Sequence, residues 1–212
     1  MKMFLASYRF GDHVDEFLAL TGMPGRIAVI ASAADGWPST ARQSAVATEV
    51  RDLRKLGFDP HELDLRSFVD RPAQLAKELD RYDTVWVRGG NTFVLRAQLS
   101  RSGADGAIAR RVREGTLTYG GYSAGACVVS TTLRGVEVAD DPDEVLPATS
   151  TKVVWDGLGL IDFAVVPHFG SILDDNGSGP KMVSQYELEN IPYRTLTDEQ
   201  VVVIDGELPI FL

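Results

Sequence analysis

Short apolar runs alternate with amphipathic segments along most of the chain. Residues 26–32 are apolar and β-branched without alternation, which is typical of a parallel strand covered on both faces. Residues 39–56 instead place apolar side chains at helical spacing and stop at a glycine. Another apolar run, 84–88, ends in Gly89-Gly90. This alternation predicts a doubly wound, mostly parallel sheet with helices on both faces and right-handed connections.

The same reasoning assigns the remaining elements. Further strands are expected at 3–7, 59–65, 116–120, 132–138 and 163–169, and further helices at 12–21, 72–79, 93–99, 105–114 and 180–190. The strand at 59–65 resembles an edge strand. Two apolar runs flank Asp205-Gly206 near the C-terminus, and this two-residue turn signal predicts a closing antiparallel hairpin.

Composition indicates the number of domains, the kind of partner and the cellular compartment. With 212 residues, 44% of them hydrophobic, the chain can fill one core, so we expect a single domain over 1–212. Lys and Arg number 21 against 30 Asp and Glu, and this balance argues against a nucleic-acid partner. One cysteine, Cys127, excludes an internal disulfide, which fits a reducing compartment. The apolar N-terminal run is too short for a signal peptide or membrane span, so we expect a cytoplasmic protein.

The stretch 116–126 carries the strongest candidate chemistry. Gly121-x-Ser123-x-Gly125 has the spacing of a nucleophile elbow, in which a serine sits on a sharp turn between a strand and a helix. Glycines are needed there because a Cβ would collide with the crowded strand and helix. The following helix offers free N–H groups that can stabilise a developing negative charge. We expect Ser123 to be a nucleophile; the alternative is a turn that only closes a βα unit.

A serine nucleophile needs a base within hydrogen-bond reach, usually a histidine. Of the three histidines, His13 lies in the first expected helix and His61 near the peripheral third strand. His168 follows a buried strand, as Ser123 does, and the carboxyl ends of such strands form the functional crevice. We therefore expect His168 to act as the base, with a purely structural histidine as the alternative.

The base in turn needs a carboxylate that holds one tautomer and stabilises the imidazolium. We consider the acidic residues between Ser123 and His168, most of which have the pattern of solvated loop charges. Glu137 differs because it interrupts a β-like run, and it is our first choice. Asp140 is the second.

Gly89-Gly90 ends a strand and exposes backbone N–H groups to the same crevice. No Lys-Ser or Lys-Thr pair follows, as a phosphate-binding P-loop requires, and the dinucleotide fingerprint is absent. Half of an oxyanion hole is the better interpretation. The N–H groups of Gly90 and Ala124 would then flank the carbonyl oxygen under attack.

Three motifs together resemble one peptidase family: Gly89-Gly90-Asn91-Thr92-Phe93, then Gly121-Tyr122-Ser123-Ala124-Gly125-Ala126, then Pro167-His168-Phe169. The resemblance is to peptidase family S51, the dipeptidase E or aspartyl dipeptidase family that includes the cyanophycinases. It implies a flavodoxin-like fold similar to the class I glutamine amidotransferases. It also implies a serine peptidase without metal or cofactor, which removes an amino acid, typically aspartate, from the N-terminus of short peptides.

Carried over by motif, Ser123 is the nucleophile, His168 the base, and Gly90 with Ala124 the oxyanion donors. The resemblance leaves the third member open. The family's Asn-Asp-x-Pro segment matches residues 139–142 only in part, whereas other members look like Ser-His-Glu enzymes and favour Glu137.

Substrate contacts are expected from Asn91, Thr92 and Arg88. An N-terminal aspartate needs a nearby cation, for which Arg88, Arg134 and Lys181 are the candidates. The expected partner is a short peptide, with no nucleic acid and no membrane, and the chain could form a homodimer. Two rival hypotheses are an esterase of the α/β-hydrolase kind and a non-catalytic binding module.

Overall fold

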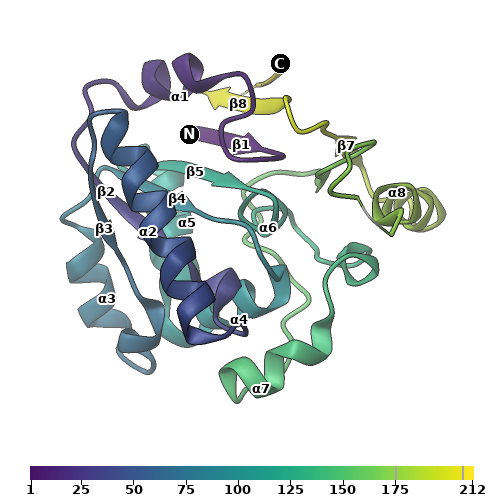
Figure 1. The fold of residues 1–212 in the computed structure, drawn as a ribbon, viewed down its shortest axis with the longest axis horizontal. Helices are drawn as coiled ribbons and strands as arrows, with labels where there is room; N and C mark the ends of the chain where they lie inside the picture. The colour runs from purple at the N-terminus through teal and green to yellow at the C-terminus, as the bar shows by residue number, and fades with distance from the viewer. Residues whose placement is uncertain (175, 207) are drawn as a thin grey trace.

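The computed structural model describes residues 1–174, 176–206 and 208–212, and most of its strands form one sheet of seven (Figure 1). The strands are β1 (Lys2–Ala6), β2 (Arg26–Ile30), β3 (Asp59–Glu62), β4 (Thr84–Val87), β5 (Thr118–Tyr122), β6 (Ala164–Val166), β7 (Tyr193–Thr195), β8 (Val201–Asp205) and β9 (Pro209–Phe211). The α-helices are α1 (Val14–Thr21), α2 (Ser39–Lys55), α3 (Pro72–Leu79), α4 (Thr92–Ser102), α5 (Ala104–Arg113), α6 (Ala124–Cys127), α7 (Val145–Thr149) and α8 (Ser178–Glu189).

The main sheet has the strand order β3-β2-β4-β5-β1-β8-β9. The first five strands are parallel, whereas β8 runs antiparallel to β1 and pairs with β9 as the predicted C-terminal hairpin. The strand at 59–62 lies at the sheet edge, also as predicted. Because β8 is antiparallel, its first residue, Val201, pairs with Ala6, the last residue of β1. The segment that enters β8 therefore lies at the edge where the parallel strands end.

Two apolar layers cover this sheet. On one face Phe17 of α1 and Leu53 of α2 pack in one cluster with Trp86 of β4. On the other face Leu95 of α4 and Ile108 of α5 belong to a second cluster with alternate residues of the strands. Figure 1 shows α2 crossing one face of the strands. The predicted α/β class with a mostly parallel sheet is confirmed.

One predicted strand belongs to a different sheet. The apolar run at 163–169 forms only β6, which pairs in parallel with β7 in a separate sheet of two strands, beside α8 in Figure 1. His168 follows β6 with a φ of 58°, a left-handed conformation. The histidine thus reaches the crevice from a second sheet and not from the main one.

The prediction of a strand at 132–138 is wrong. In the described chain Thr132 makes only an isolated β-bridge, and Val136–Val138 forms a turn of 3₁₀-helix. Gly135 has a φ of 92°, and a Cβ there would collide with the ring of Tyr186. This left-handed glycine, packed against an aromatic ring, breaks the extended backbone that the apolar residues suggested.

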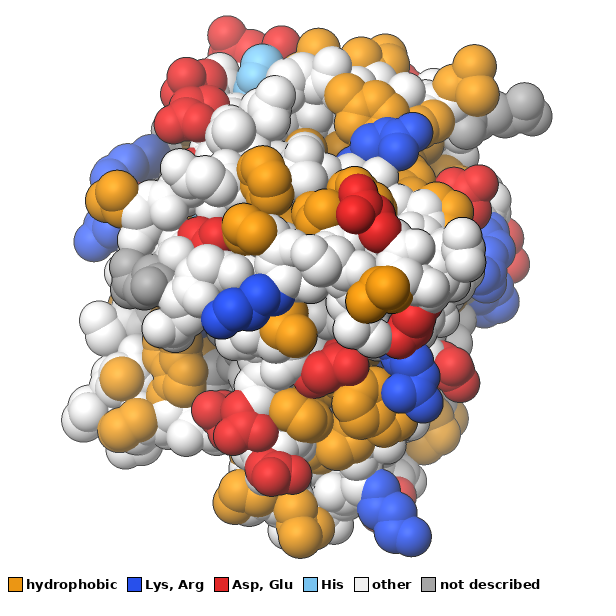
Figure 2. All heavy atoms as spheres, turned by 90° about the vertical axis from the view of Figure 1, so that its right-hand side faces the viewer, with side chains coloured by type: hydrophobic (Ala, Val, Ile, Leu, Met, Phe, Trp, Pro, Cys, Tyr) orange, Lys and Arg blue, Asp and Glu red, His pale blue; other side chains and the backbone are white. Residues whose placement is uncertain are grey.

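The surface carries charges of both signs. Figure 2 shows the face that includes α8, where acidic, basic and apolar side chains are interspersed. Among the helices in the described ranges, none combines the length and apolar character needed to span a bilayer.

Candidate active site

Ser123 lies between β5 and α6 on a strained turn. Its φ of 52° and ψ of −118° fall in a region that few non-glycine residues adopt, at a cost of about 1–3 kcal/mol. A Cβ at Gly121 would lie 2.9 Å from the carbonyl oxygen of Gly125, and a Cβ at Gly125 would collide with the carbonyl of Val87 at the end of β4. Glycine is therefore needed at both positions. This is the geometry of a nucleophile elbow.

His168 meets Ser123 at the carboxyl ends of the strands. The imidazole Nε2 lies 3.1 Å from Ser123 Oγ, within hydrogen-bond distance. The backbone N–H of His168 donates to the hydroxyl of Ser7 at 2.7 Å. Because Ser7 directly follows β1, this bond ties the left-handed turn at His168 to the main sheet. The two side chains that sequence analysis selected are therefore brought together.

Asp198 holds the other side of the imidazole. Its Oδ1 lies 2.6 Å from His168 Nδ1 and also accepts the Ser7 hydroxyl at 3.1 Å, while Ser171 donates to Oδ2. Burial acts to raise the pKa of Asp198, but hydrogen bonds from Ser171 and His168 outweigh it and lower the pKa below the usual value. A carboxylate in this place favours the tautomer with hydrogen on Nδ1, which leaves Nε2 free to accept the Ser123 proton.

The two acids that sequence analysis favoured are engaged elsewhere. Glu137 accepts the N–H of Gly135 at 2.6 Å, which stabilises the start of its own 3₁₀ turn. Asp140 accepts the N–H of Thr92 at 2.8 Å, at the N-terminus of α4. The expectation that one of them orients His168 is corrected, because Asp198 takes that position.

Asp198 lies outside the segment between Ser123 and His168, from which the acid was expected. The observed chain order is Ser123, His168, Asp198, whereas α/β-hydrolases have the order serine, acid, histidine. A signal was present: Asp198 comes just before the first strand of the predicted antiparallel hairpin. If that hairpin is placed beside a parallel strand, the residues that enter it lie at the crevice.

The loop after β4 packs directly against the elbow. Gly90 has a φ of 143°, and a Cβ there would lie 2.5 Å from the carbonyl oxygen of Ala33. A Cβ on Gly89 would lie 2.9 Å from the Cβ of Ser123. Within residues 1–174, 176–206 and 208–212, the N–H groups of Gly90 and Ala124 donate to no protein acceptor. Both donors thus remain available beside the serine.

The two polar residues that follow this loop differ in role. The side chain of Asn91 accepts the N–H groups of Phe93 and Val94 at 2.9 and 3.1 Å and donates to the carbonyl of Asp141. Asn91 therefore caps α4, and the expectation that its side chain binds substrate is corrected. Thr92 does line a cavity next to Ser123.

Two cavities share Ser123 and His168. The smaller, of about 150 Å³ and here named the Asp140 cavity, is lined by Asp140, by the polar Thr92 and Ser178 and by several apolar side chains. The larger, of about 260 Å³ and here named the Arg88 cavity, is lined by Arg88, Tyr8 and Trp37 with the glycine loop. The Arg88 guanidinium lies 4.9 Å from the Trp37 ring centroid. A substrate bound across Ser123 would thus face Asp140 on one side and Arg88 on the other.

A buried carboxylate anchors the elbow to α2. Glu49 is 3% exposed and accepts hydrogen bonds from Trp86 Nε1 at 2.9 Å and from the Tyr122 hydroxyl at 2.7 Å. Arg88 Nε lies 3.5 Å from the same carboxylate. Burial raises the pKa of Tyr122, so the phenol stays protonated as a donor. Because Tyr122 directly precedes Ser123, this network fixes the strand that ends in the nucleophile.

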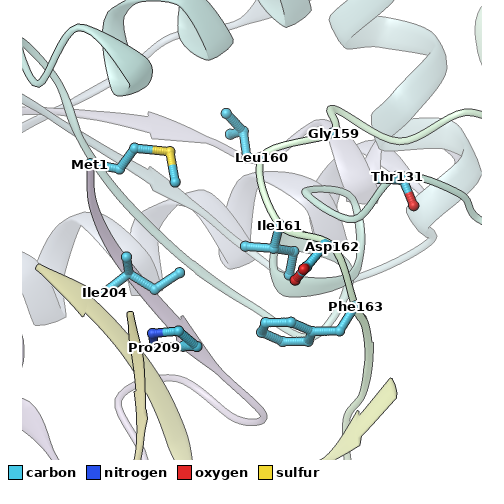
Figure 3. A pocket seen from close by; sticks show the side chains of 9 residues that line it. All are labelled: Met1, Thr131, Gly159, Leu160, Ile161, Asp162, Phe163, Ile204 and Pro209. Atoms are coloured by element: carbon cyan, nitrogen blue, oxygen red, sulfur yellow. The ribbon is translucent and has the colours of Figure 1, made fainter. Parts of the chain in front are cut away.

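A third cavity lies away from these groups. It has a volume of about 320 Å³, and Figure 3 shows Met1, Ile161 and Phe163 around it, with Asp162 as the one charged side chain labelled. Neither Ser123 nor His168 lines it. Among the described residues, no group of three or more His, Cys, Asp or Glu side chains is arranged to hold a metal ion.

An α/β fold with a serine on such an elbow, opposed by a histidine and a carboxylate, defines a candidate hydrolase of the Ser-His-acid kind. The family model of peptidase family S51 matches residues 9–209. The chain therefore belongs to peptidase family S51, and the family suggested by the three motifs is confirmed.

Individual relatives agree with this assignment. The chain is 36% identical over 120 residues to a Listeria innocua protein named "Uncharacterized peptidase Lin0382", covering 57% of this chain and 54% of that protein. The match thus spans about half the length of this relative. A Pasteurella multocida protein named "Uncharacterized peptidase PM1590" is 27% identical over 213 residues, 99% of this chain and 96% of that protein. A solved structure, a putative peptidase E from Listeria monocytogenes EGD-e, superposes with a TM-score of 0.82 at 26% identity and covers 100% of this chain and 97% of its own.

Proposed function

We propose that this chain is a serine peptidase that hydrolyses short peptides through an acyl-enzyme intermediate. The observation that carries the proposal is the hydrogen-bonded line from Ser123 through His168 to Asp198, with 3.1 and 2.6 Å between the paired atoms. Membership of peptidase family S51 and the two free N–H groups beside Ser123 support it. A solved relative described as a putative peptidase E, from Listeria monocytogenes, also supports peptidase activity.

In the first half of the reaction His168 Nε2 takes the Ser123 proton as the hydroxyl oxygen attacks the scissile carbonyl carbon. Asp198 stabilises the imidazolium that forms. The N–H groups of Gly90 and Ala124 donate to the carbonyl oxygen as it becomes negative. When the C–N bond breaks, the imidazolium gives its proton to the leaving amine and Ser123 carries the acyl group. Water, activated by His168, then releases the N-terminal product.

The charges that flank Ser123 suit a short, zwitterionic peptide. Arg88 supplies a cation in the larger cavity and could pair with a substrate carboxylate, either the C-terminus or an N-terminal aspartate side chain. The other two cation candidates are engaged outside these cavities: Arg134 lies over Trp155, and Lys181 donates to the carbonyl of Asn176. Two cations line the larger cavity, Arg88 and Arg9. Arg9 pairs with Asp52 at 2.8 Å, whereas Arg88 Nε lies 3.5 Å from Glu49, so Arg88 is the candidate for carboxylate recognition.

The proposal extends to the fold family and to the cellular compartment. The doubly wound sheet with its elbow serine supports a single domain with a fold of the class I glutamine amidotransferase kind. One cysteine among 212 residues is consistent with action in the cytoplasm.

A peptide panel tests the proposal. The wild-type protein is incubated with di- and tripeptides, with and without N-terminal aspartate, and free amino acids are quantified. Ser123→Ala should fold normally and lose hydrolysis, whereas the exposed-serine control Ser44→Ala should keep it. Hydrolysis of p-nitrophenyl esters without peptide cleavage would instead support an esterase. A protein that binds peptides but resists a fluorophosphonate serine probe would be a binding module.

A further inference from the structure

Asp198 lies outside the helices and strands that position Ser123. It belongs to the turn between β7 and β8, in which the N–H of Gln200 donates to the carbonyl of Thr197 at 3.0 Å. The side chain of Asp198 is 20% exposed, so water can reach the carboxylate. Rotation of a carboxylate about its Cβ–Cγ bond is soft, because this torsion has broad minima. The orientation of Asp198 toward His168 therefore depends on the donors that bind its two oxygens.

These donors divide unequally between the two oxygens. Oδ1 faces His168 Nδ1 at 2.6 Å and accepts the Ser7 hydroxyl at 3.1 Å. Oδ2 accepts the hydroxyl of Ser171, and within the described part of the chain it has no other protein donor. Donors on one oxygen alone would leave the carboxylate free to turn about that oxygen. Ser171 is thus the residue that fixes the second oxygen, and with it the plane of the carboxylate.

The loop after β6 holds the Ser171 hydroxyl in place. The backbone N–H of Ser171 donates to the carbonyl of His168 at 3.0 Å, so this serine is anchored to the base itself. Its Oγ accepts the N–H of Leu173 at 3.0 Å. A serine hydroxyl has only one hydrogen to donate, and here that hydrogen goes to Asp198. One turn therefore carries both the base and the hydroxyl that orients its acid.

The electrostatics and the cavities agree with this geometry. Burial acts to raise the pKa of Asp198, and the hydrogen bond from Ser171 is the largest of the contributions that lower it. Leu173 lines both cavities beside Ser123, whereas Ser171 is not among the described residues that line either of them. Ser171 thus contacts the acid and not the substrate.

We propose that Ser171 is a positioning residue of the reaction, which holds the Asp198 carboxylate in the orientation that His168 requires. This role rests on the proposed serine peptidase function. Ser7 cannot replace Ser171, because the Ser7 hydroxyl meets only Oδ1 and also accepts the backbone N–H of His168. When the Ser171 hydroxyl is removed, water can take its place at Oδ2 and restore a hydrogen bond but not the fixed orientation. The loss is therefore smaller than the loss of the carboxylate itself.

A double-mutant cycle on the labelling of Ser123 tests this role. A fluorophosphonate reacts with the serine once, so slow variants stay measurable and no choice of peptide is needed. The labelling rate is measured for the wild type, Ser171→Ala, Asp198→Ala and the double variant. Ser171→Thr restores a hydroxyl. Ser184→Ala is the matched control, because exposed Ser184 donates to the carbonyl of Pro180 within α8.

We expect Ser171→Ala to slow labelling about 10–100-fold, or about 1.4–2.7 kcal/mol of activation free energy, as for a hydrogen bond to a charged group. In the Asp198→Ala background the same substitution should change the rate less than about threefold, because the group through which Ser171 acts is gone. Ser171→Thr and Ser184→Ala should stay within about threefold of wild type. On the best substrate of the peptide panel, Ser171→Ala should lower kcat and leave KM within about twofold.

Labelling of Ser171→Ala at the wild-type rate would overturn the inference. An equal further loss in the Asp198→Ala background would overturn it too, since Ser171 would then act through the fold. A raised KM with unchanged kcat would mean that Ser171 acts on the substrate through Leu173, and a Ser171→Thr as slow as Ser171→Ala would mean that the hydroxyl is not the active group; either result contradicts the inference. A wild-type protein that cleaves no peptide and whose Ser123 is not labelled would instead contradict the proposed function itself.

Discussion

Replacing Asp198 by Asn is the sharpest perturbation of the proposed mechanism. The wild-type carboxylate faces His168 Nδ1 at 2.6 Å and accepts hydroxyl donors from Ser7 and Ser171. An asparagine has nearly the same shape, but one of its two terminal atoms is an NH₂ group that can only donate. If that group faces Nδ1, the imidazole must carry its hydrogen on Nε2, where it cannot accept the Ser123 proton.

The expected loss of kcat is large because proton transfer from Ser123 depends on the tautomer of His168 and on the negative charge of Asp198. Loss of the negative charge removes the partner that stabilises the imidazolium, and the wrong tautomer removes the base. For a serine triad the acid-to-amide change lowers kcat by about 10⁴, which corresponds to about 5 kcal/mol of activation free energy. The substitution leaves KM nearly unchanged, since Asp198 does not touch the substrate in the proposed mechanism.

The assay is kcat and KM for the best substrate of the peptide panel, with circular dichroism and Tm as checks on folding. Glu137→Gln is the informative comparison, because Glu137 was the acid that sequence analysis favoured. We expect Glu137→Gln to stay within about threefold of wild type. A correctly folded Asp198→Asn that keeps kcat within about tenfold of wild type, or a larger loss in Glu137→Gln, would rule out Asp198 as the acid that orients His168.

Three further substitutions test the surrounding structure. Gly90→Ala should lower Tm and reduce kcat about 100-fold or more, because the new Cβ would lie 2.5 Å from the carbonyl oxygen of Ala33 and would displace an oxyanion donor. The control Gly115→Ala is also at positive φ but has open space around it, so it should cost only about 1 kcal/mol of stability. Glu49→Ala should lower the free energy of unfolding by about 3 kcal/mol, or roughly 6–12 °C in Tm, since it orphans two buried donors; an unchanged Tm would contradict the anchoring role. The pKa of Asp140 is raised in the folded state, so wild-type stability falls as pH rises through the window between its unfolded and folded pKa values. Asp140→Asn should therefore have the higher Tm at pH 8 and equal wild type near pH 3, and a lower Tm at pH 8 would contradict this.

Much of the fold follows from local sequence signals. Continuous apolar runs marked the parallel strands, and the pair of alternating runs near the C-terminus marked the hairpin, because burial on one face or on both sets these patterns. The elbow was predictable for a similar reason: glycine at 121 lets β5 approach α6, and glycine at 125 lets α6 approach the end of β4. His168 followed from its place after a buried strand.

The parts that could not be predicted depend on tertiary position. Which sheet a short strand joins is not encoded in its own apolar pattern, so β6 was expected in the main sheet. The strand at 132–138 failed because the left-handed turn at Gly135 outweighs the β-propensity of its neighbours. Asp198 lies in a short loop with no pattern of its own. Its role appears only when β8 is placed antiparallel beside β1, which brings the loop to the crevice.

The proposed mechanism depends on Ser123 being a nucleophile that His168 activates. Intact-mass spectrometry after incubation with a fluorophosphonate measures this most directly, with peptide mapping to locate the adduct. We expect one adduct on Ser123 in the wild-type protein, at least about 100-fold slower labelling of His168→Ala, and no adduct on Ser123→Ala. Undiminished peptide hydrolysis by Ser123→Ala, or an adduct located on another residue, would contradict it.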